Sequence, residues 1–276
     1  MRKSGLAILL TIASLAGGGE LRIDHVTVAG RDLKDLRAKF AAAGVPTVYG
    51  GKHTNGLTEM ALASFADGSY LELIAAQAPA AGAPGHYWQK FIDENAGPCA
   101  WAIRSDNIRA DAERLGGHLT QGGRKRFDGV ELKWTSAAVG PGAQGTFFPF
   151  LIQDITARDL RAYPQGKPTL PSEAGVAFVI IGVHDLDEAV ARYRKGFDLG
   201  EPERYRDAVL GAKMARFPRT PVVLAAPDGP WLEARLRKFG EAPCAFVLRG
   251  DGAGQITWLP IEGMRIGITR GAQTVH

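Results

Sequence analysis

The sequence predicts an α+β fold in which a β-α-β-β-β module is repeated about four times to form cupped mixed sheets. A strand-like segment returns four times, and in each copy one position lies seven residues before an aspartate. The position that repeats is occupied by His25, Cys99, Phe178 and Cys244. Spacing this regular indicates one supersecondary unit copied along the chain.

The first three copies continue into helical patterns. The aspartates at the fixed offset, Asp32, Asp106 and Asp185, are natural N-caps because their carboxylates accept hydrogen bonds from free backbone N–H groups. Apolar residues then follow at helical spacing. Glycines near the expected helix ends are Gly44, Gly116 and Gly196.

Segments of β character follow each helix, and they complete the module. They cover residues 60–65 and 70–75, then 131–137 and 146–153, then 208–217 and 221–226. The fourth copy is abbreviated, because only a few residues separate Asp251 from the strand-like stretch 255–260. We therefore expect a two-module region over residues 21–160 and a second, degenerate half over residues 172–276.

The N-terminus has the pattern of a secretory signal peptide over residues 1–16. A basic start, a short apolar run from Leu6 to Leu15 and the small-residue sequence Ser14-Leu15-Ala16 support this interpretation. An uncleaved membrane anchor is the alternative, although the run is shorter than the roughly 20 residues that span a bilayer. We expect an exported protein, periplasmic or secreted, with no stable membrane insertion after cleavage.

The composition is that of an ordinary globular protein. The chain has 276 residues and a formal net charge of +4. Removal of Arg2 and Lys3 with the signal segment leaves 31 basic against 29 acidic residues, so nucleic acid is not an expected partner. The sequence has no nucleophile elbow, phosphate-binding glycine loop, zinc-protease motif or CxxC pair. Cys99 and Cys244 are expected to be small buried thiols, and a disulfide bridge between them is the alternative.

Four stretches, taken in order, resemble the vicinal oxygen chelate superfamily and its glyoxalase-like branch. They are Ile23-Asp24-His25-Val26-Thr27-Val28, Gly50-Gly51-Lys52-His53-Thr54-Asn55-Gly56, Asp67-Gly68-Ser69-Tyr70-Leu71-Glu72-Leu73-Ile74-Ala75 and Pro149-Phe150-Leu151-Ile152-Gln153. The resemblance covers residues 21–155 well and residues 174–270 more weakly. It implies paired modules that form a cup around a divalent metal.

The resemblance implies that His25 and Glu72 are metal ligands. Strand alternation places Glu72 on the opposite face from Leu71 and Leu73, and a carboxylate inside a cup needs a cation or hydrogen-bond donors. Cys99 stands where a second histidine is expected, and Gln153 is the nearest oxygen ligand on the closing strand. This set suits zinc, iron, manganese or nickel. Alternatively, His25 and Glu72 satisfy each other without a metal.

Glu72 is also the candidate catalytic group, and four residues are candidates for substrate binding: His53, Tyr70, Trp101 and Arg126. Tyr70 would share a face with Glu72, and Trp101 with Cys99, so that the cup has aromatic walls. Structural alternatives remain: His53 as a turn residue, and Arg126 as part of a hairpin closed by Asp128-Gly129.

Three classes of function are open. The first is a metal-dependent lyase, isomerase or ring-cleaving dioxygenase that chelates vicinal oxygens of a small substrate. The second is a metal-free periplasmic protein that binds or sequesters a small molecule. The third is a degenerate structural module that pairs with another protein, and a homodimer is one such pairing. The fold does not choose among them, because this superfamily hosts many reactions.

Overall fold

In the computed structural model, the described residues are 20–77, 86–170, 172, 175–250 and 255–269. The predicted signal segment, residues 1–16, and Asp251 lie outside them, so export stays a prediction. None of the helices in the described residues is long and apolar enough to span a membrane.

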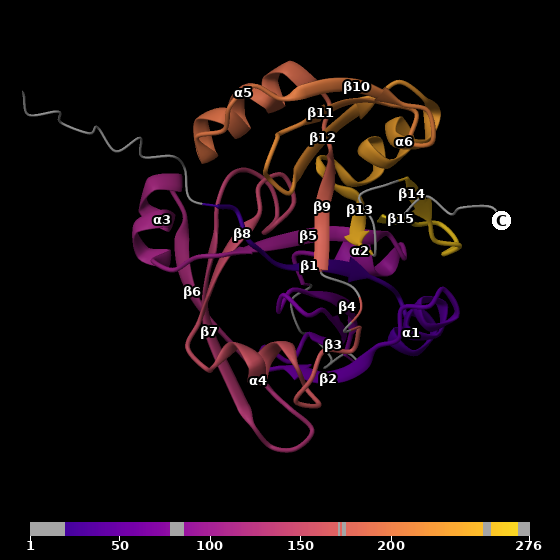
Figure 1. Ribbon diagram of the computed structural model, residues 1–276. Coiled ribbons are helices and arrows are strands. Elements are labelled where there is room, and N and C mark those ends of the chain that lie inside the picture. Colours follow the sequence, from indigo (N-terminus) through magenta and orange to yellow (C-terminus); the bar gives the residue numbers. More distant parts are fainter. Residues whose placement is uncertain (1–19, 78–85, 171, 173–174, 251–254, 270–276) are drawn as a thin grey trace, which may run out of the picture.

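The first eight strands close into a barrel (Figure 1), in the order β1-β4-β3-β2-β6-β7-β8-β5. Each β-α-β-β-β module supplies half of it, because β1 pairs parallel with β4 and β5 pairs parallel with β8. The halves join where β1 pairs with β5 and β2 with β6. The strands are β1 (Ile23–Ala29), β2 (Val48–His53), β3 (Thr58–Ser64), β4 (Tyr70–Ala76), β5 (Gly97–Arg104), β6 (His118–Lys125), β7 (Glu131–Ala138) and β8 (Phe150–Asp154).

Four helices of the described residues accompany the barrel. They are α1 (Leu33–Ala42), α2 (Gln89–Asp93), α3 (Ile108–Leu115) and α4 (Arg158–Ala162). The first and third are the predicted module helices. Asp32 caps α1 as predicted, whereas the cap of α3 is Asn107, whose side chain accepts from the backbone of Ala110. Asp106 instead forms an exposed ion pair with Arg22.

The rest of the described chain forms a seven-stranded sheet, in the order β10-β11-β12-β9-β13-β15-β14. This sheet contains one full copy of the module, from β9 to β12. It also contains a shorter copy, from β13 to β15, whose described residues form no helix. Its elements are β9 (Gly175–Gly182), α5 (Leu186–Phe197), β10 (Glu203–Asp207), β11 (Ala212–Arg216), β12 (Val222–Pro227), α6 (Pro230–Phe239), β13 (Ala242–Arg249), β14 (Ile256–Trp258) and β15 (Arg265–Thr269). Gly196 lies inside α5, which ends at the left-handed Asp198.

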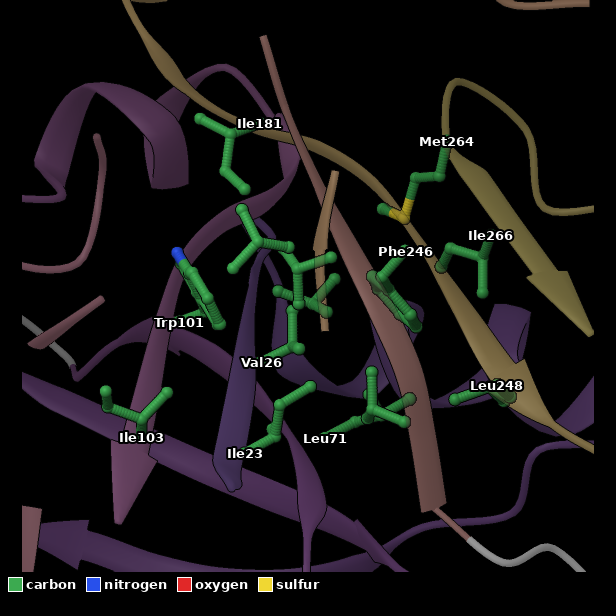
Figure 2. Close-up of a cluster of buried hydrophobic side chains, with 14 of the residues drawn as sticks. Ile23, Val26, Leu71, Trp101, Ile103, Ile181, Phe246, Leu248, Met264 and Ile266 are labelled. Carbon is green, nitrogen blue, oxygen red and sulfur yellow. The ribbon is translucent and has the colours of Figure 1, made fainter. Parts of the chain in front are cut away.

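These fifteen strands of the described residues confirm the predicted α+β fold of repeated modules. The barrel lies within residues 21–160 and the open sheet within 172–276, while their division into separate domains stays a prediction. One continuous apolar core joins them: Figure 2 shows Val26 and Trp101 from the barrel in the same layer as Phe246 from the open sheet. Because this layer is buried, the open sheet covers one outer side of the barrel.

Two β-bulges in the β1–β5 ladder decide which side chains enter the barrel. The register shifts between Ile23 and His25 and again between Thr27 and Val28, which leaves Asp24 and Cys99 as the extra residues. A bulge breaks the strict alternation of a strand. Asp24 and His25 therefore both face inward, and Cys99 and Trp101 face different sides.

Candidate functional site

A cavity of about 230 Å³ occupies the barrel interior, and its wall comes from both modules. Its polar wall includes His25, His53, Glu72, Arg124 and Arg161. Aromatic side chains complete the wall: Tyr70, Tyr87, Trp88, Trp134 and Phe150. The cavity is smaller than the ~300–1,000 Å³ of most drug-sized sites, so its size suits a small organic molecule.

Glu72 is the buried carboxylate of this cavity. Its Oε2 lies 3.5 Å from His25 Nε2 and accepts from the Thr27 hydroxyl at 3.1 Å, while its Oε1 lies 3.3 Å from His53 Nε2. Burial by itself would raise the pKa of Glu72, but His25, His53 and the Thr27 hydroxyl together outweigh it and lower the pKa to about 2. Glu72 is therefore ionised at neutral pH.

His25 is oriented by Asp24, the residue that the first bulge turns inward. His25 Nδ1 and Asp24 Oδ1 are 2.6 Å apart. Burial opposes ionisation of Asp24, but Arg161 and Arg158 outweigh it and hold its pKa well below the usual value. An ionised carboxylate only accepts, so His25 donates from Nδ1 to Asp24, and its Nε2 faces Glu72.

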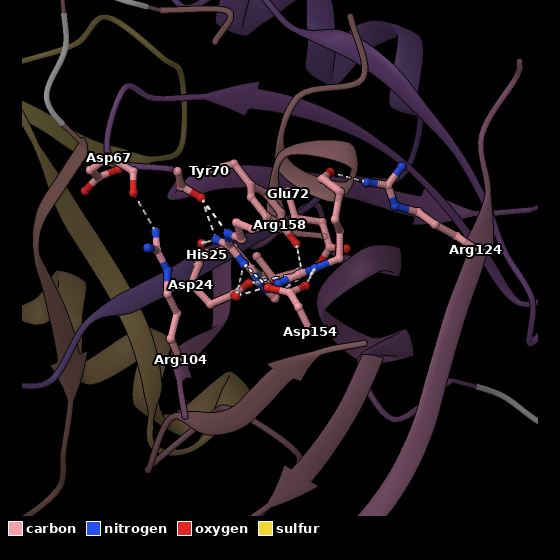
Figure 3. A network of polar contacts seen from close by, with 12 residues as sticks. Asp24, His25, Asp67, Tyr70, Glu72, Arg104, Arg124, Asp154 and Arg158 are labelled. Atoms are coloured by element: carbon pink, nitrogen blue, oxygen red, sulfur yellow. Dashed lines mark hydrogen bonds and ion pairs between the residues drawn. The ribbon is translucent and has the colours of Figure 1, made fainter. Parts of the chain in front are cut away.

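A network of two arginines fixes Asp24 in the barrel (Figure 3). Arg161 donates to both oxygens of Asp24, at 3.2 and 2.6 Å, and to the Tyr70 hydroxyl at 2.6 Å. Arg158 also binds Asp24, and both arginines contact Asp154. Since Arg158 and Arg161 lie on α4, this short helix after the second module anchors the β1 bulge from outside the repeat.

His53 and Tyr70, two predicted substrate-binding residues, face the cavity. His53 Nδ1 is 2.9 Å from the Thr58 hydroxyl, and Tyr70 stacks on His25 with ring centroids 4.9 Å apart. Both side chains are therefore held by neighbours before any ligand binds. Their role in substrate binding stays a proposal.

The structure does not bring Cys99 and Gln153 to His25 and Glu72. The Cys99 thiol lies in an apolar cluster, where Sγ is 3.6 Å from the Thr27 carbonyl oxygen and burial raises the pKa of the thiol. Gln153 faces the outside of the barrel, where its amide bonds the backbone of Ile108 and Asp106 at the start of α3. Phe150 and Ile152 are the β8 residues that face the cavity, because they alternate with Gln153. The predicted four-ligand metal set does not assemble.

Trp101 and Arg126 also lie away from the cavity wall. The Trp101 side chain packs in the core between barrel and open sheet, because the bulge at Cys99 separates the two side chains. Arg126 is bound by Asp128 and donates to the carbonyls of Leu160 and Pro164, at 3.1 and 2.7 Å. Arg126 therefore ties the β6–β7 turn to α4 and to Pro164.

Replacement of Trp101 by Phe tests its position in the core. The buried Trp101 Nε1 finds no acceptor in the described part of the chain. Phenylalanine removes this unpaired donor but fills less volume, and these two effects oppose each other. We expect Trp101→Phe to stay within about 1 kcal/mol of the wild-type free energy of unfolding, measured by urea titration. Ligand affinity lost without a change in stability would contradict the core position.

His86 is a cavity residue that the sequence reasoning missed. Burial, the largest cause, and the nearby His53 lower the pKa of His86 to about 4. Between about pH 6.5 and pH 4, His86 binds a proton in the unfolded chain but not in the folded chain. The contribution of neutral His86 to the free energy of unfolding is therefore full above about pH 6.5 and is lost as the pH falls toward about 4.

We expect the wild type to lose about 1–2 kcal/mol at pH 5 relative to pH 7 through His86 alone. The measurement is urea unfolding at both pH values for wild type and His86→Gln. The variant should lack this part of the loss. His118→Gln, an exposed histidine change on β6, is the control and should keep it. Equal losses in wild type and His86→Gln would contradict the assignment.

The donors at Glu72 suit a divalent metal in their chemistry. Two imidazoles and one carboxylate form a common ligand set for transition metals, and a carboxylate bound to the far nitrogen of a ligand histidine, as Asp24 is to His25, is its usual support. As the side chains stand, both Nε2 atoms are directed at the carboxylate itself. Among the described residues, no group of three or more His, Cys, Asp or Glu side chains is arranged around a common point for an ion. Binding would require the His25 and His53 rings to turn from Glu72.

The other missed residues share a reason. Asp24, Arg124, Arg158 and Arg161 enter the site through a bulge, a glycine-lined strand and a five-residue helix, none of which has a periodic signal. The sequence signal for the helix was charge alone: Arg158 and Arg161 are three residues apart and follow Asp154 closely. Such a pattern is typical of many solvated helices.

Comparison with known proteins agrees with this architecture. A family model described as a glyoxalase-like domain matches residues 23–175, which is more than half of the chain. A comparison with curated protein sequences finds no match.

Solved structures share the whole fold at low sequence identity. A hypothetical protein from Staphylococcus aureus is 14% identical, with a TM-score of 0.64 over 90% of this chain and 99% of the other. A mutant of 4-hydroxymandelate synthase from Streptomyces coelicolor is 13% identical, with a TM-score of 0.53 over 84% of this chain and 72% of the other. Identities this low show the fold alone. The family match and the paired modules together establish that this chain belongs to the glyoxalase-like domain family, with the fold of the vicinal oxygen chelate superfamily.

Proposed function

We propose that the barrel is the active site of an enzyme that binds a small organic molecule with adjacent oxygen atoms and transfers a proton at Glu72. The observation that carries the proposal is the contact of one ionised, buried carboxylate with two imidazoles at the wall of a cavity. Buried ionised groups are costly to maintain, and they concentrate at functional sites. The reaction class is a lyase, an isomerase or a ring-cleaving dioxygenase.

The residues of the chain have distinct roles in this proposal. Glu72 is the base, because its carboxylate is ionised and faces the cavity. His25 donates from Nδ1 to Asp24, and this bond holds its Nε2 toward Glu72 and the cavity. His53 approaches the other Glu72 oxygen and can donate to an oxyanion from the same side. The aromatic wall excludes water around the reacting atoms.

A divalent metal would be held by His25, His53 and Glu72 after the two rings turn from the carboxylate. When bound, a metal of this kind polarises vicinal oxygens of a substrate as a Lewis acid. In each ring Nε2 would be the nitrogen that binds the metal, because Nδ1 is already contacted by Asp24 in His25 and by Thr58 in His53. Localisation outside the cytoplasm is part of this proposal and rests on the signal pattern alone.

The experiment is metal content by mass spectrometry on protein from residue 17 onward, after reconstitution with divalent metal and gel filtration. We expect near one metal per chain in the wild type and loss in His25→Ala, His53→Ala and Glu72→Ala. Cys99→Ala and Gln153→Ala are matched controls and should retain the metal, because their side chains lie outside the cavity wall.

Wild type without metal would overturn the metal-chelate enzyme. The alternative is a metal-free binding protein, and the observation that favours it is the direct contact of both imidazoles with Glu72. Such a protein would show ligand-dependent thermal stabilisation in metal-free buffer, since any ligand that binds only the folded state stabilises it.

A further inference from the structure

The cavity wall contains two fully buried arginines whose charges are balanced differently. Arg161 is 1% exposed, and its guanidinium meets the carboxylates of Asp24 and Asp154. Arg124 is also 1% exposed, but its ion-pair partners are missing: among the described residues, no carboxylate lies within 4 Å of its guanidinium. Among the described residues of the wall, it is therefore the arginine without an ion-pair partner.

Arg124 is held in place by backbone oxygens instead. Nη1 donates to the carbonyl of Gly50 and Nη2 to the carbonyl of Arg161, each at 2.6 Å. A guanidinium has five N–H donors, so these two bonds fix its orientation and leave further donors. Figure 3 shows Arg124 reaching from β6 toward the rest of the polar network. An oriented guanidinium is pre-organised for an oxyanion, because little entropy is lost when one binds.

Two glycines make room for this arrangement. A Cβ at Gly50 would lie 2.3 Å from the Leu62 and Met60 side chains, in the region where the Arg124 guanidinium meets the Gly50 carbonyl. A Cβ at Gly122 would lie 2.2 Å from Nε1 of Trp134, whose indole also lines the cavity. Gly50 thus lets the Leu62 and Met60 side chains lie close to the barrel wall beside Arg124, and Gly122 does the same for the Trp134 ring.

The charge balance of the wall selects the ligand. Glu72 is the carboxylate among the wall residues, and it is already contacted by two imidazoles and a hydroxyl. One unbalanced guanidinium matches one negative charge. A phosphate dianion would need a second free cation, and Arg161 is committed to Asp24 and Asp154. The aromatic wall and the small volume favour a compact, flat anion.

We infer that the substrate of this cavity carries a carboxylate group and that Arg124 binds that group. The inference rests on the proposed function, because it assigns the substrate class of the same site. Arg124 then orients the molecule so that its uncharged end faces Glu72. Arginine suits this task, because its planar fork matches a carboxylate in two parallel hydrogen bonds.

The test uses two pairs of probes with matched shape: benzoate with benzamide, and phenylacetate with phenylacetamide. Binding is followed by tryptophan fluorescence, since Trp88 and Trp134 line the cavity. In the wild type we expect each carboxylate to bind at least about tenfold tighter than its amide. Arg124→Gln should weaken carboxylate binding by at least about tenfold and leave amide binding unchanged. Lys125→Gln removes the same charge from the exposed neighbour on β6 and should match the wild type.

Circular dichroism verifies that Arg124→Gln is folded, and Arg124→Lys is the second variant. Lysine keeps the charge but loses the planar fork, so carboxylate affinity should lie between those of wild type and Arg124→Gln. Equal binding of carboxylates and amides by the wild type would overturn the inference. So would carboxylate binding by Arg124→Gln at the wild-type level.

The outcome is separable from that of the proposed function. If the wild type holds no metal but binds carboxylates through Arg124, this inference is supported and the metal-chelate enzyme is overturned. Metal that depends on His25 and Glu72, with no preference for carboxylates over amides, supports the enzyme and overturns this inference.

Discussion

Replacement of Asp24 by Asn is expected to lower the free energy of unfolding by about 3–5 kcal/mol. The Asp24 side chain is fully buried and balances the guanidinium groups of Arg158 and Arg161. Asparagine keeps the shape but removes the charge, so the buried Arg161 and the partly buried Arg158 keep only Asp154 as a carboxylate partner. For a chain of this size, the melting temperature should fall by roughly 6–20 °C.

The matched control is Asp106→Asn. It removes the same charge from an ion pair with Arg22 in which the aspartate side chain is 88% exposed. Exposed ion pairs contribute about 0–1 kcal/mol, so this variant should melt close to the wild type. Calorimetry on the three proteins at pH 7 is the measurement. If the two variants melt at the same temperature, the Asp24 network does not stabilise the barrel as the contacts indicate.

Replacement of Glu72 by Gln is expected to lower turnover by about 10²–10⁴-fold for any substrate that the wild type converts. Glutamine has almost the same shape but cannot take a proton, and it does not present a negative charge to His25 and His53. The experiment is a screen of vicinal dicarbonyl and catechol-like compounds with the wild type, followed by kinetics of both proteins on each compound converted.

Glu131→Gln is the control for Glu72→Gln, because it makes the same change at an exposed position of β7. It should keep the wild-type turnover. Melting curves of all three proteins separate lost chemistry from lost structure. Turnover in a folded Glu72→Gln protein that equals the wild type would remove Glu72 from the reaction and leave the binding-protein alternative.

The repeat itself was readable from the sequence, because each module carries a local signal. The helix caps Asp32 and Asp185 and the alternation around Glu72 are properties of a few neighbouring residues. Strands with weak alternation, such as β6 and β10, were not identified, because many of their residues are exposed on both faces. Helix α6 was missed although it begins with proline at an early position, where proline is favoured.

The site residues also divide into those whose position the sequence predicted and those whose position it did not. His25, Glu72, His53 and Tyr70 were named from the sequence and meet in one cavity, because each lies on the inward face of a strand or at its end. Trp101 was wrongly placed on the cavity wall because one bulge at Cys99 reverses the face of a side chain, and a bulge leaves no mark in the apolar pattern. Gln153 was assigned a face without a known register, and the β7–β8 pairing turns it outward.

Local sequence thus determined the modules, their order and the pair His25 and Glu72, since hydrophobic periodicity and capping depend on residues close along the chain. Only the tertiary structure decided that Asp24 turns inward beside His25, that α4 returns two arginines to balance it, and that Arg124 remains without a carboxylate in the described residues. These facts depend on strand register and on contacts across more than a hundred residues, as between Asp24 and Arg161. Burial then gives such contacts their electrostatic strength, because opposite charges attract each other more strongly in the low dielectric of the barrel interior than in water.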